Sequence, residues 1–231
     1  MLKRFKRLSS SQIILLGFGT LILTGTFLLM LPFSSRSGQW TSFTDALFTA
    51  TSASCVTGLI VQDTATYWSM FGQLIIIILI QIGGLGVVTM AVAVAIASGR
   101  KIGLSRRQTM QDAISATQLG GIVKMTGFIL KGCLLVELAG AVFYSFVFIP
   151  EFGLVKGLWY SVFHSVSAFC NAGFDLMGIK AQFSSLTDYS ANVIISLTTV
   201  ALILIGGIGF SAWDDFIKYK FKFSRYRLQT K

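Results

Sequence analysis

The stretch DALFTATSASCVTGL at residues 45–59 returns in altered form as YSVFHSVSAFCNAGF at residues 160–174. The positions that are identical in the two copies pair Phe48 with Phe163, Ser52 with Ser167, Ala53 with Ala168, Cys55 with Cys170 and Gly58 with Gly173. A second shared motif follows each copy: Ile82-Gly83-Gly84-Leu85-Gly86 in the first and Ile205-Gly206-Gly207-Ile208-Gly209 in the second. Because self-similarity on this scale marks duplicated structural units, the chain is predicted to contain one fold twice.

The composition excludes a soluble domain. Hydrophobic residues make up 54% of the 231 residues and charged residues only 12%. No charge occurs in residues 8–35, 64–99 or 189–213, and residues 132–150 contain only Glu137. A helix needs roughly 20 apolar residues to cross a bilayer, so the chain is predicted to be an all-α polytopic membrane protein. The first run is longer than the apolar region of a signal peptide and lacks a clear cleavage site, so we interpret it as a retained helix.

Each repeat is predicted to consist of a span, a half-span and a second span. The first repeat, residues 1–120, has a span at about 12–31, a pore helix at 41–54, a filter loop at 55–59, a span at about 68–98 and a cytoplasmic connection at 99–120. The second repeat, residues 121–231, has a span at about 125–149, a pore helix at 155–169, a filter loop at 170–174, a span at about 189–213 and a basic cytoplasmic tail. Two full spans return the chain to its starting side, so the repeats are predicted to be parallel, unlike the inverted repeats of many carriers.

The basic residues predict the orientation. All but three of the nineteen lysines and arginines are predicted to lie on one side of the membrane, near the termini, in the connection between the repeats or at the start of the span that follows it. The exceptions are Arg36, Lys156 and Lys180. By the positive-inside rule both termini are cytoplasmic, in a multi-pass protein of the cell membrane. The lipid bilayer thus accounts for the net charge of +10 without any nucleic acid partner.

The half-spans carry the predicted site. Ser42 and Asp45 are spaced as a capping box at the start of the first half-span, so its C-terminal end, with the negative end of the helix dipole, points into the membrane before Gly58. This end favours a cation. A glycine with positive φ lets successive carbonyl oxygens replace the hydration shell of an ion. One such glycine is typical of an ordinary tight turn, but Gly58 and Gly173 occupy the same place in both copies, which favours the ion site.

These residues resemble the Trk/Ktr/HKT superfamily of potassium transporters, most closely the N-terminal half of its Ktr-type membrane subunit. The motifs that carry the resemblance are residues 52–59, residues 168–174, the two Gly-Gly-x-Gly elements and Trp213-Asp214-Asp215. The resemblance implies four helix–pore loop–helix units around one pore. It implies that carbonyl groups in both filter loops coordinate potassium, with sodium as a further transported ion and no other cofactor or metal. The residues that would line this filter are Val56, Thr57, Gly58, Asn171, Ala172 and Gly173, flanked by Cys55, Leu59, Cys170 and Phe174.

The chain supplies two of the four loops that the resemblance implies. We expect it to be part of a longer four-repeat protein, and the alternative is that two copies assemble one pore. The resemblance also implies a homodimer of the full-length protein and a cytosolic, nucleotide-binding regulatory ring as partner. We expect the connection with Arg100, Lys101, Arg106 and Arg107 to contribute to docking of that ring.

The remaining candidates have simpler interpretations. Gly83, Gly84, Gly206 and Gly207 are typical of close helix packing, with a bend in the inner helices as the alternative. His164 has no metal-ligand companions, and the three cysteines have no metal spacing.

Glu137 is an ionisable residue inside a span, for which a functional and a structural role remain equally open. No arrangement of residues predicts a hydrolytic enzyme. The sequence therefore predicts an ion-conducting subunit, with a non-conducting membrane scaffold or an inactive fragment as alternatives.

Overall fold

The computed structural model describes residues 10–86, 89, 122–220 and 226. Every secondary-structure element in that part of the chain is a helix, as predicted. The helices are α1 (Ser10–Met30), η1 (Pro32–Ser34), α2 (Phe43–Ser54), α3 (Met70–Leu85), α6 (Ile122–Phe152), α7 (Leu154–Phe169), η3 (Met177–Ile179), η4 (Thr187–Tyr189), α8 (Val193–Gly207) and α9 (Phe210–Tyr219). The predicted connection at 99–120 and its four basic residues lie outside the described residues.

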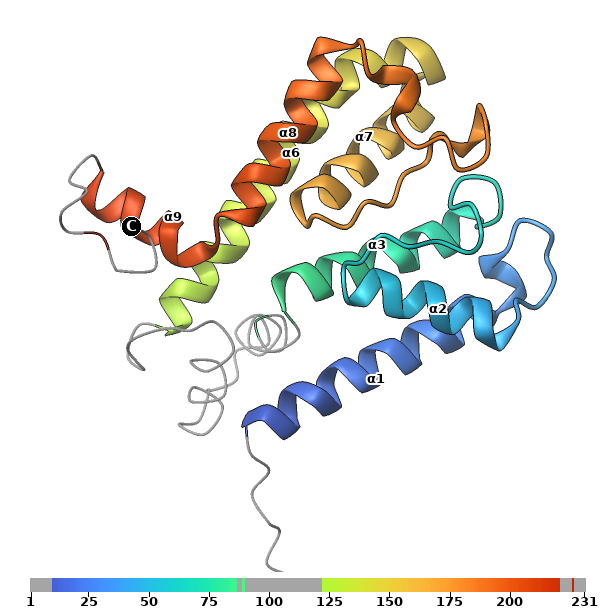
Figure 1. Cartoon of the computed structure of the whole chain (residues 1–231), viewed down its shortest axis with the longest axis horizontal. Coiled ribbons are helices and arrows are strands. Elements are labelled where there is room, and N and C mark those ends of the chain that lie inside the picture. Colours follow the sequence, from blue (N-terminus) through green and yellow to red (C-terminus); the bar gives the residue numbers. More distant parts are fainter. Residues whose placement is uncertain (1–9, 87–88, 90–121, 221–225, 227–231) are drawn as a thin grey trace, which may run out of the picture.

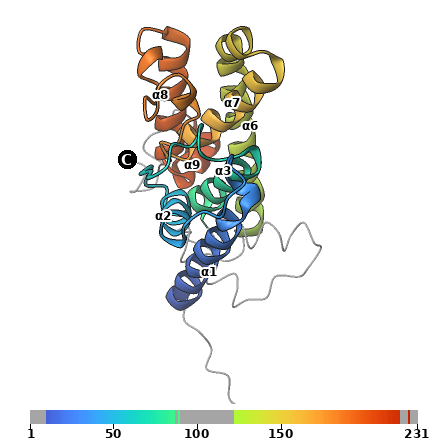
Figure 2. The same cartoon turned by 90° about the vertical axis from the view of Figure 1, so that its right-hand side faces the viewer.

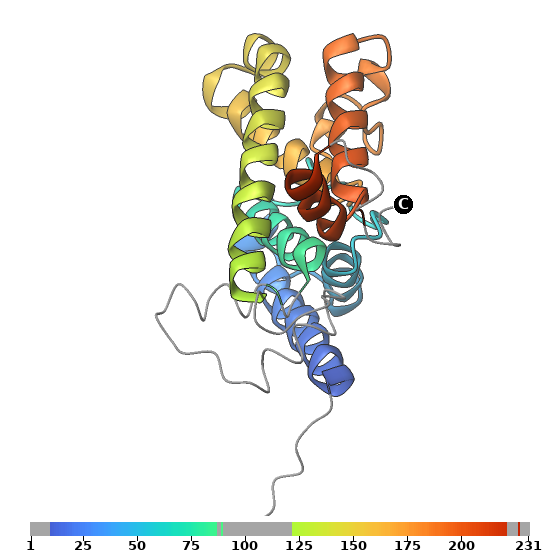
Figure 3. The same ribbon diagram turned by 90° about the vertical axis from the view of Figure 1, so that its left-hand side faces the viewer.

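The helices form two units with the same order and direction. In Figure 1, α1 and α6 both run from left to right, and α3 and α8 both return to the left. The short helices α2 and α7 lie inside this turn, and each precedes a loop that starts near the middle of the molecule. Figures 2 and 3 show from two further sides that α6 and α8 stand as neighbouring columns.

Length and apolarity suit α1 and α6 for crossing a membrane. Ser11–Met30 comprises 20 residues and Thr126–Phe152 comprises 27, and both are strongly apolar. The described part of α3 is a shorter apolar helix of 16 residues. Large hydrophobic side chains such as Leu15, Leu135 and Leu197 lie exposed on α1, α6 and α8. Exposed apolar faces of this extent are expected where lipid or further protein replaces water.

The inner helices α3 and α8 both end close to the third glycine of their shared motif: α3 ends at Leu85, next to Gly86, and α8 ends at Gly207, two residues before Gly209. Gly86 has φ +84° and ψ +133°, and Gly209 has φ +89° and ψ +149°. These backbone angles are readily adopted only by glycine. After Gly209 the chain continues as α9, whose residues 212–219 make an angle of 93° with α8. Figure 3 shows α9, in dark red, lying across the space between α6 and α8.

Polar side chains also join the two units inside the apolar body. Trp159 of α7 donates from Nε1 to Oε1 of Gln73 of α3 at 2.8 Å, and Gln81 of α3 donates from Nε2 to Oε1 of Glu137 of α6 at 2.8 Å. The inner helix of the first unit therefore packs against both the short helix and the outer helix of the second.

Candidate functional site

Two loops, residues 55–59 (the first loop) and residues 170–174 (the second loop), leave the ends of α2 and α7 in the same way. The Thr57 amide donates to the Ser52 carbonyl at 3.0 Å, and the Ala172 amide donates to the Ser167 carbonyl at 2.7 Å. Since these four residues occupy matching positions in the two copies, the repeated sequence encodes one local structure. At the start of α2, Ser42 Oγ caps the Asp45 amide as predicted.

Both loops alternate between positive and negative φ. Val56 has φ +57° and Gly58 has +76°, while Asn171 has +58° and Gly173 has +75°. The residue inside each pair keeps a negative φ. Such alternation lets successive peptide groups face one side of the chain. A non-glycine residue in the left-handed region costs about 1–3 kcal/mol, and this strain is greatest for the β-branched Val56.

The two loops meet at their glycines. A Cβ atom at Gly58 would lie 2.5 Å from the carbonyl oxygen of Ala172, and one at Gly173 would lie 3.6 Å from Cα of Gly58. The structure therefore brings together backbone from both loops, which are 115 residues apart in sequence. The flanking residues differ in exposure: Cys55 and Leu59 are exposed, Cys170 is half-buried, and Phe174 is buried.

The first glycine of each inner-helix pair packs against the end of a short helix. A Cβ atom at Gly83 would overlap the carbonyl oxygen of Ser54, the last residue of α2. A Cβ atom at Gly206 would overlap the carbonyl oxygen of Phe169, the last residue of α7. Close packing is thus the observed role of these two glycines, which both lie within helices.

The second glycine of each pair has a different neighbour. A Cβ atom at Gly84 would lie 2.7 Å from Sγ of Cys170, so α3 of the first unit also touches the start of the second loop. A Cβ atom at Gly207 would lie 3.9 Å from its nearest neighbour, Nδ2 of Asn171, which is an ordinary contact distance. The glycines with positive φ, Gly86 and Gly209, lie two residues beyond these pairs.

Side chains support the second loop from behind. His164 Nδ1 lies 2.7 Å from the Tyr160 carbonyl, and its Nε2 lies 3.3 Å from the Leu176 amide. Because the amide can only donate, Nε2 is the acceptor and Nδ1 carries the proton. Ser167 Oγ donates to the Phe174 carbonyl at 2.6 Å. The lone histidine therefore fixes the chain after the loop.

Asp63 joins the outer connections of the two units. Its Oδ1 accepts from the amides of Ala65 at 3.1 Å and Thr66 at 2.8 Å, and its Oδ2 accepts from the Phe183 amide at 3.0 Å. A Cβ atom at Gly178 would overlap the same carboxylate. Sequence reasoning missed this contact because nothing in the local pattern links residues 120 positions apart.

A polar cavity of about 250 Å³ lies beside the second loop. Asn171 and Gly173 line it from the loop, and Asp175, Tyr144 and Thr199 line it from the surrounding elements. Burial raises the pKa of the Asp175 carboxyl above its ordinary value, and the nearby Asp63 adds to this, while the hydrogen bond from the Met177 amide opposes it. The cavity thus combines backbone of the second loop with a carboxyl group whose charge is disfavoured.

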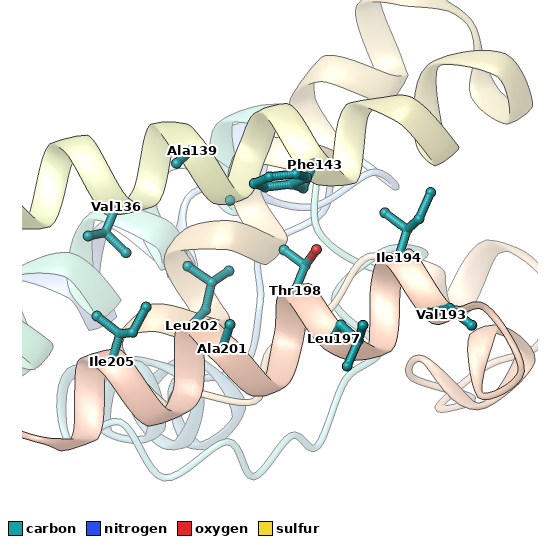
Figure 4. A pocket seen from close by; sticks show the side chains of 11 residues that line it. Val136, Ala139, Phe143, Val193, Ile194, Leu197, Thr198, Ala201, Leu202 and Ile205 are labelled. Atoms are coloured by element: carbon teal, nitrogen blue, oxygen red, sulfur yellow. The ribbon is translucent and has the colours of Figure 1, made fainter.

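A larger cavity of about 410 Å³ between α6 and α8 has no such chemistry. Figure 4 shows Val136 of α6 facing Leu202 and Ile205 of α8, with Phe143 further along. Apart from the Thr198 hydroxyl, its lining side chains are apolar. Among the described residues, no group of three or more histidine, cysteine or acidic side chains could hold a metal ion. The loops therefore remain the candidate site for a cation.

Comparison with known proteins places the chain among cation transporters. A family model described as "TrkH: Cation transport protein" matches residues 5–231. The potassium/sodium uptake protein NtpJ of Enterococcus hirae is 48% identical over 214 residues, which cover 93% of this chain and 46% of the relative. The Ktr system potassium uptake protein B of Bacillus subtilis is 39% identical over 228 residues, or 99% of this chain and 49% of the relative. The chain spans about half the length of the curated relatives it matches.

Proposed function

Because the chain belongs to the TrkH family of cation transport proteins, we propose that it forms part of a potassium-conducting pore in the cell membrane. The observation that carries this proposal is the pair of loops: both alternate in backbone handedness, both follow the C-terminal end of a short helix, and their glycines touch. Inward-facing carbonyl groups replace the hydration shell of a potassium ion. The dipoles of α2 and α7 add negative potential at the same place.

In this proposal the carbonyls of Val56, Thr57 and Gly58 and of Asn171, Ala172 and Gly173 coordinate the ion. Potassium moves inward down its electrochemical gradient, and sodium is a second permeant ion. Two relatives bear names that include potassium uptake, and one of these names also includes sodium. The pore is completed by further repeats of a longer chain or by a second copy of this one. No catalytic chemistry is required of the protein.

The proposal also includes partners. Two relatives are named as proteins of a Ktr system, which supports association with other subunits. We include a cytosolic nucleotide-binding ring that docks on the cytoplasmic face, where both termini also lie, and a homodimer of the complete protein. Changing Arg100, Lys101, Arg106 and Arg107 to glutamine should weaken binding of the ring, as measured by co-purification from membranes. Full retention of the ring would remove this connection from the docking surface.

Ion flux in liposomes tests the central claim. Vesicles carrying the purified chain, and in parallel the complete product of its gene, are loaded with potassium or sodium and followed with an ion-sensitive dye. The proposal expects cation flux with a preference for potassium. Gly58→Ser should lower the potassium-to-sodium permeability ratio, because the added Cβ displaces the Ala172 carbonyl.

Gly173→Ser should act in the same direction, because it strains the equivalent backbone. The amount of folded protein in the membrane is measured for each variant as a control. An unchanged ratio in both variants would remove the two loops from the filter. Absence of flux from the complete protein would favour a membrane scaffold instead.

A further inference from the structure

The carboxyl group of Glu137 lies inside the apolar body, and the preceding proposal gives it no role. The residue is 7% exposed and belongs to the membrane-spanning helix α6. Its Oε1 accepts a hydrogen bond from Nε2 of Gln81 in α3, at 2.8 Å, across the boundary between the two units. An ionised carboxylate within a span is costly, and the partner of Glu137 here is a neutral amide. The surroundings of Glu137 therefore raise the question whether its carboxyl group is ionised or protonated.

The side-chain amide of Gln81 favours a protonated Glu137. Its Oε1 is buried and has no hydrogen-bond partner among the described residues. Leaving a buried acceptor unpaired costs about 1–3 kcal/mol. A carboxylate has no proton to offer this oxygen, whereas a carboxylic acid has one. A neutral acid facing a primary amide can donate O–H to the amide oxygen while it accepts N–H from the amide nitrogen, which satisfies both groups.

The pair lies where it can set the relation between the two loops. Gln81 comes two and three residues before Gly83 and Gly84, which press against Ser54 and Cys170 at the bases of the first and second loops. On the other side, the backbone carbonyl of Glu137 accepts from Oγ of Ser165 in α7 at 2.6 Å. Side-chain and backbone contacts thus connect the inner helix of one unit to the short helix that carries the loop of the other.

The matching positions of the internal repeat carry no polar pair. Gly25 and Gly140 occupy matching places, since a Cβ atom at either would lie 2.7 Å from Cδ1 of a leucine in its own inner helix, Leu79 or Leu202.

With this register, Ile22 corresponds to Glu137 and Leu204 corresponds to Gln81. The matching positions therefore carry apolar residues, of which Leu204 is 60% exposed, and the polar pair occurs at the boundary where the two units meet.

We propose that protonated Glu137 and Gln81 form a two-point acid–amide pair that holds the two loops in register, which makes Glu137 a positioning residue for ion selectivity. This inference rests on the proposed function. Its first test is spectroscopic. Infrared spectra of the complete protein at neutral pH should contain a carboxylic-acid carbonyl band that disappears in Glu137→Gln and returns in the exchanged variant Gln81→Glu/Glu137→Gln. Absence of this band from the wild type would overturn the pair.

The second test measures selectivity. Gln81→Leu leaves the acid without its partner and should lower the potassium-to-sodium permeability ratio by about two- to thirtyfold, the range expected for coupling of 0.5–2 kcal/mol. The exchanged variant should restore the ratio to within about twofold, because it recreates the pair with the roles reversed. Restored protein abundance without restored selectivity would show a merely structural contact and would contradict the positioning role.

Gln73→Leu is the matched control. It removes the hydrogen bond that Gln73 accepts from Trp159 of the second unit, together with the bonds that Gln73 donates to the Thr64 and Trp68 carbonyls, at a position ten residues before Gly83. This variant should keep the wild-type ratio, and an equal loss of selectivity would overturn the inference.

Failure of the wild type to conduct potassium or to prefer it over sodium would instead contradict the proposed function. In that case the infrared band still decides on the pair.

Discussion

At Gly58 two constraints act together, whereas at Gly173 only one acts. Both glycines have a positive φ, but only at Gly58 would a Cβ atom overlap the opposite loop, at 2.5 Å from Ala172. Gly58→Ala should therefore impair potassium flux more than Gly173→Ala, for which backbone strain of about 1–2 kcal/mol is the main cost. The measurement is potassium flux per folded protein for the two variants. A larger loss in Gly173→Ala would contradict the observed contact between the loops.

The carboxyl of Asp175 gives a prediction about pH. Burial raises its pKa in the folded protein, so the folded state binds the proton more tightly than the unfolded state does. By linkage, this group destabilises the protein increasingly as pH rises above its unfolded pKa. Asp175→Asn can still accept from the Met177 amide, and it should raise the melting temperature at pH 8 while leaving it nearly unchanged at pH 4. A gain that is larger at pH 4 would show that the carboxylate is stabilised in the folded protein.

The amino-acid types predicted the sign of φ at some loop positions and not at others. The paired glycines indicated positive φ from sequence alone, and the structure has it at both. Nothing predicted a left-handed backbone at Val56, because a β-branched residue disfavours it. Asn171 tolerates that region more readily, but its sequence neighbours gave no signal. Here the hydrogen bonds from the loop back to the short helix override the local preference.

At the scale of elements, adjacent glycines of α8 offer a matched pair of substitutions. A Cβ atom at Gly206 would overlap the Phe169 carbonyl, whereas at Gly207 the nearest atom would be 3.9 Å away. Gly206→Ala should therefore lower thermal stability by about 1–3 kcal/mol through forced displacement of α7 from α8. Gly207→Ala should be neutral or slightly stabilising, because alanine favours a helix over glycine. Equal melting temperatures for the two variants would argue against the close contact of α8 with the end of α7.

The helices themselves were predictable because their apolar runs and caps are local signals. The short helices expected at 41–54 and 155–169 appear as Phe43–Ser54 and Leu154–Phe169. The span expected at 189–213 instead consists of α8 and α9 with a turn at Gly209. The Gly-Gly-x-Gly motif did not single out Gly209 as the position of a turn, because a glycine within an apolar run can serve close packing or a bend. Only the tertiary arrangement separates these roles among the three glycines.

For the whole molecule, orientation can be tested by chemical labelling. Cysteines introduced at Gln39 and Gln182 should react with an impermeant thiol reagent added outside, whereas one at Lys218 should react only after the membrane is opened. The native Cys55 is exposed and should be replaced by serine in the background. The control is labelling of each variant in detergent. Outside labelling at position 218 would reverse the predicted orientation.

The carboxylate of Asp63 supports both outer connections at once. Asp63→Asn can supply only one acceptor oxygen, while three backbone amides contact the carboxylate. We expect a loss of about 1–3 kcal/mol in thermal stability, with the fold retained. Asp188→Asn, at an exposed position of the same outer region, is the control and should have little effect. A neutral Asp63→Asn would show that the link contributes nothing measurable.

The long separation between Asp63 and Phe183 also has a consequence for biogenesis. During synthesis the first unit enters the bilayer before Phe183 has left the ribosome. At that stage Oδ2 of Asp63 lacks its native hydrogen-bond donor, the Phe183 amide. Contacts within a unit form early, and the contact across the units closes last, after the loop entropy of the intervening chain has been overcome. Newly made protein should therefore pass through a stage in which both units are inserted but an external protease still cuts the outer connections.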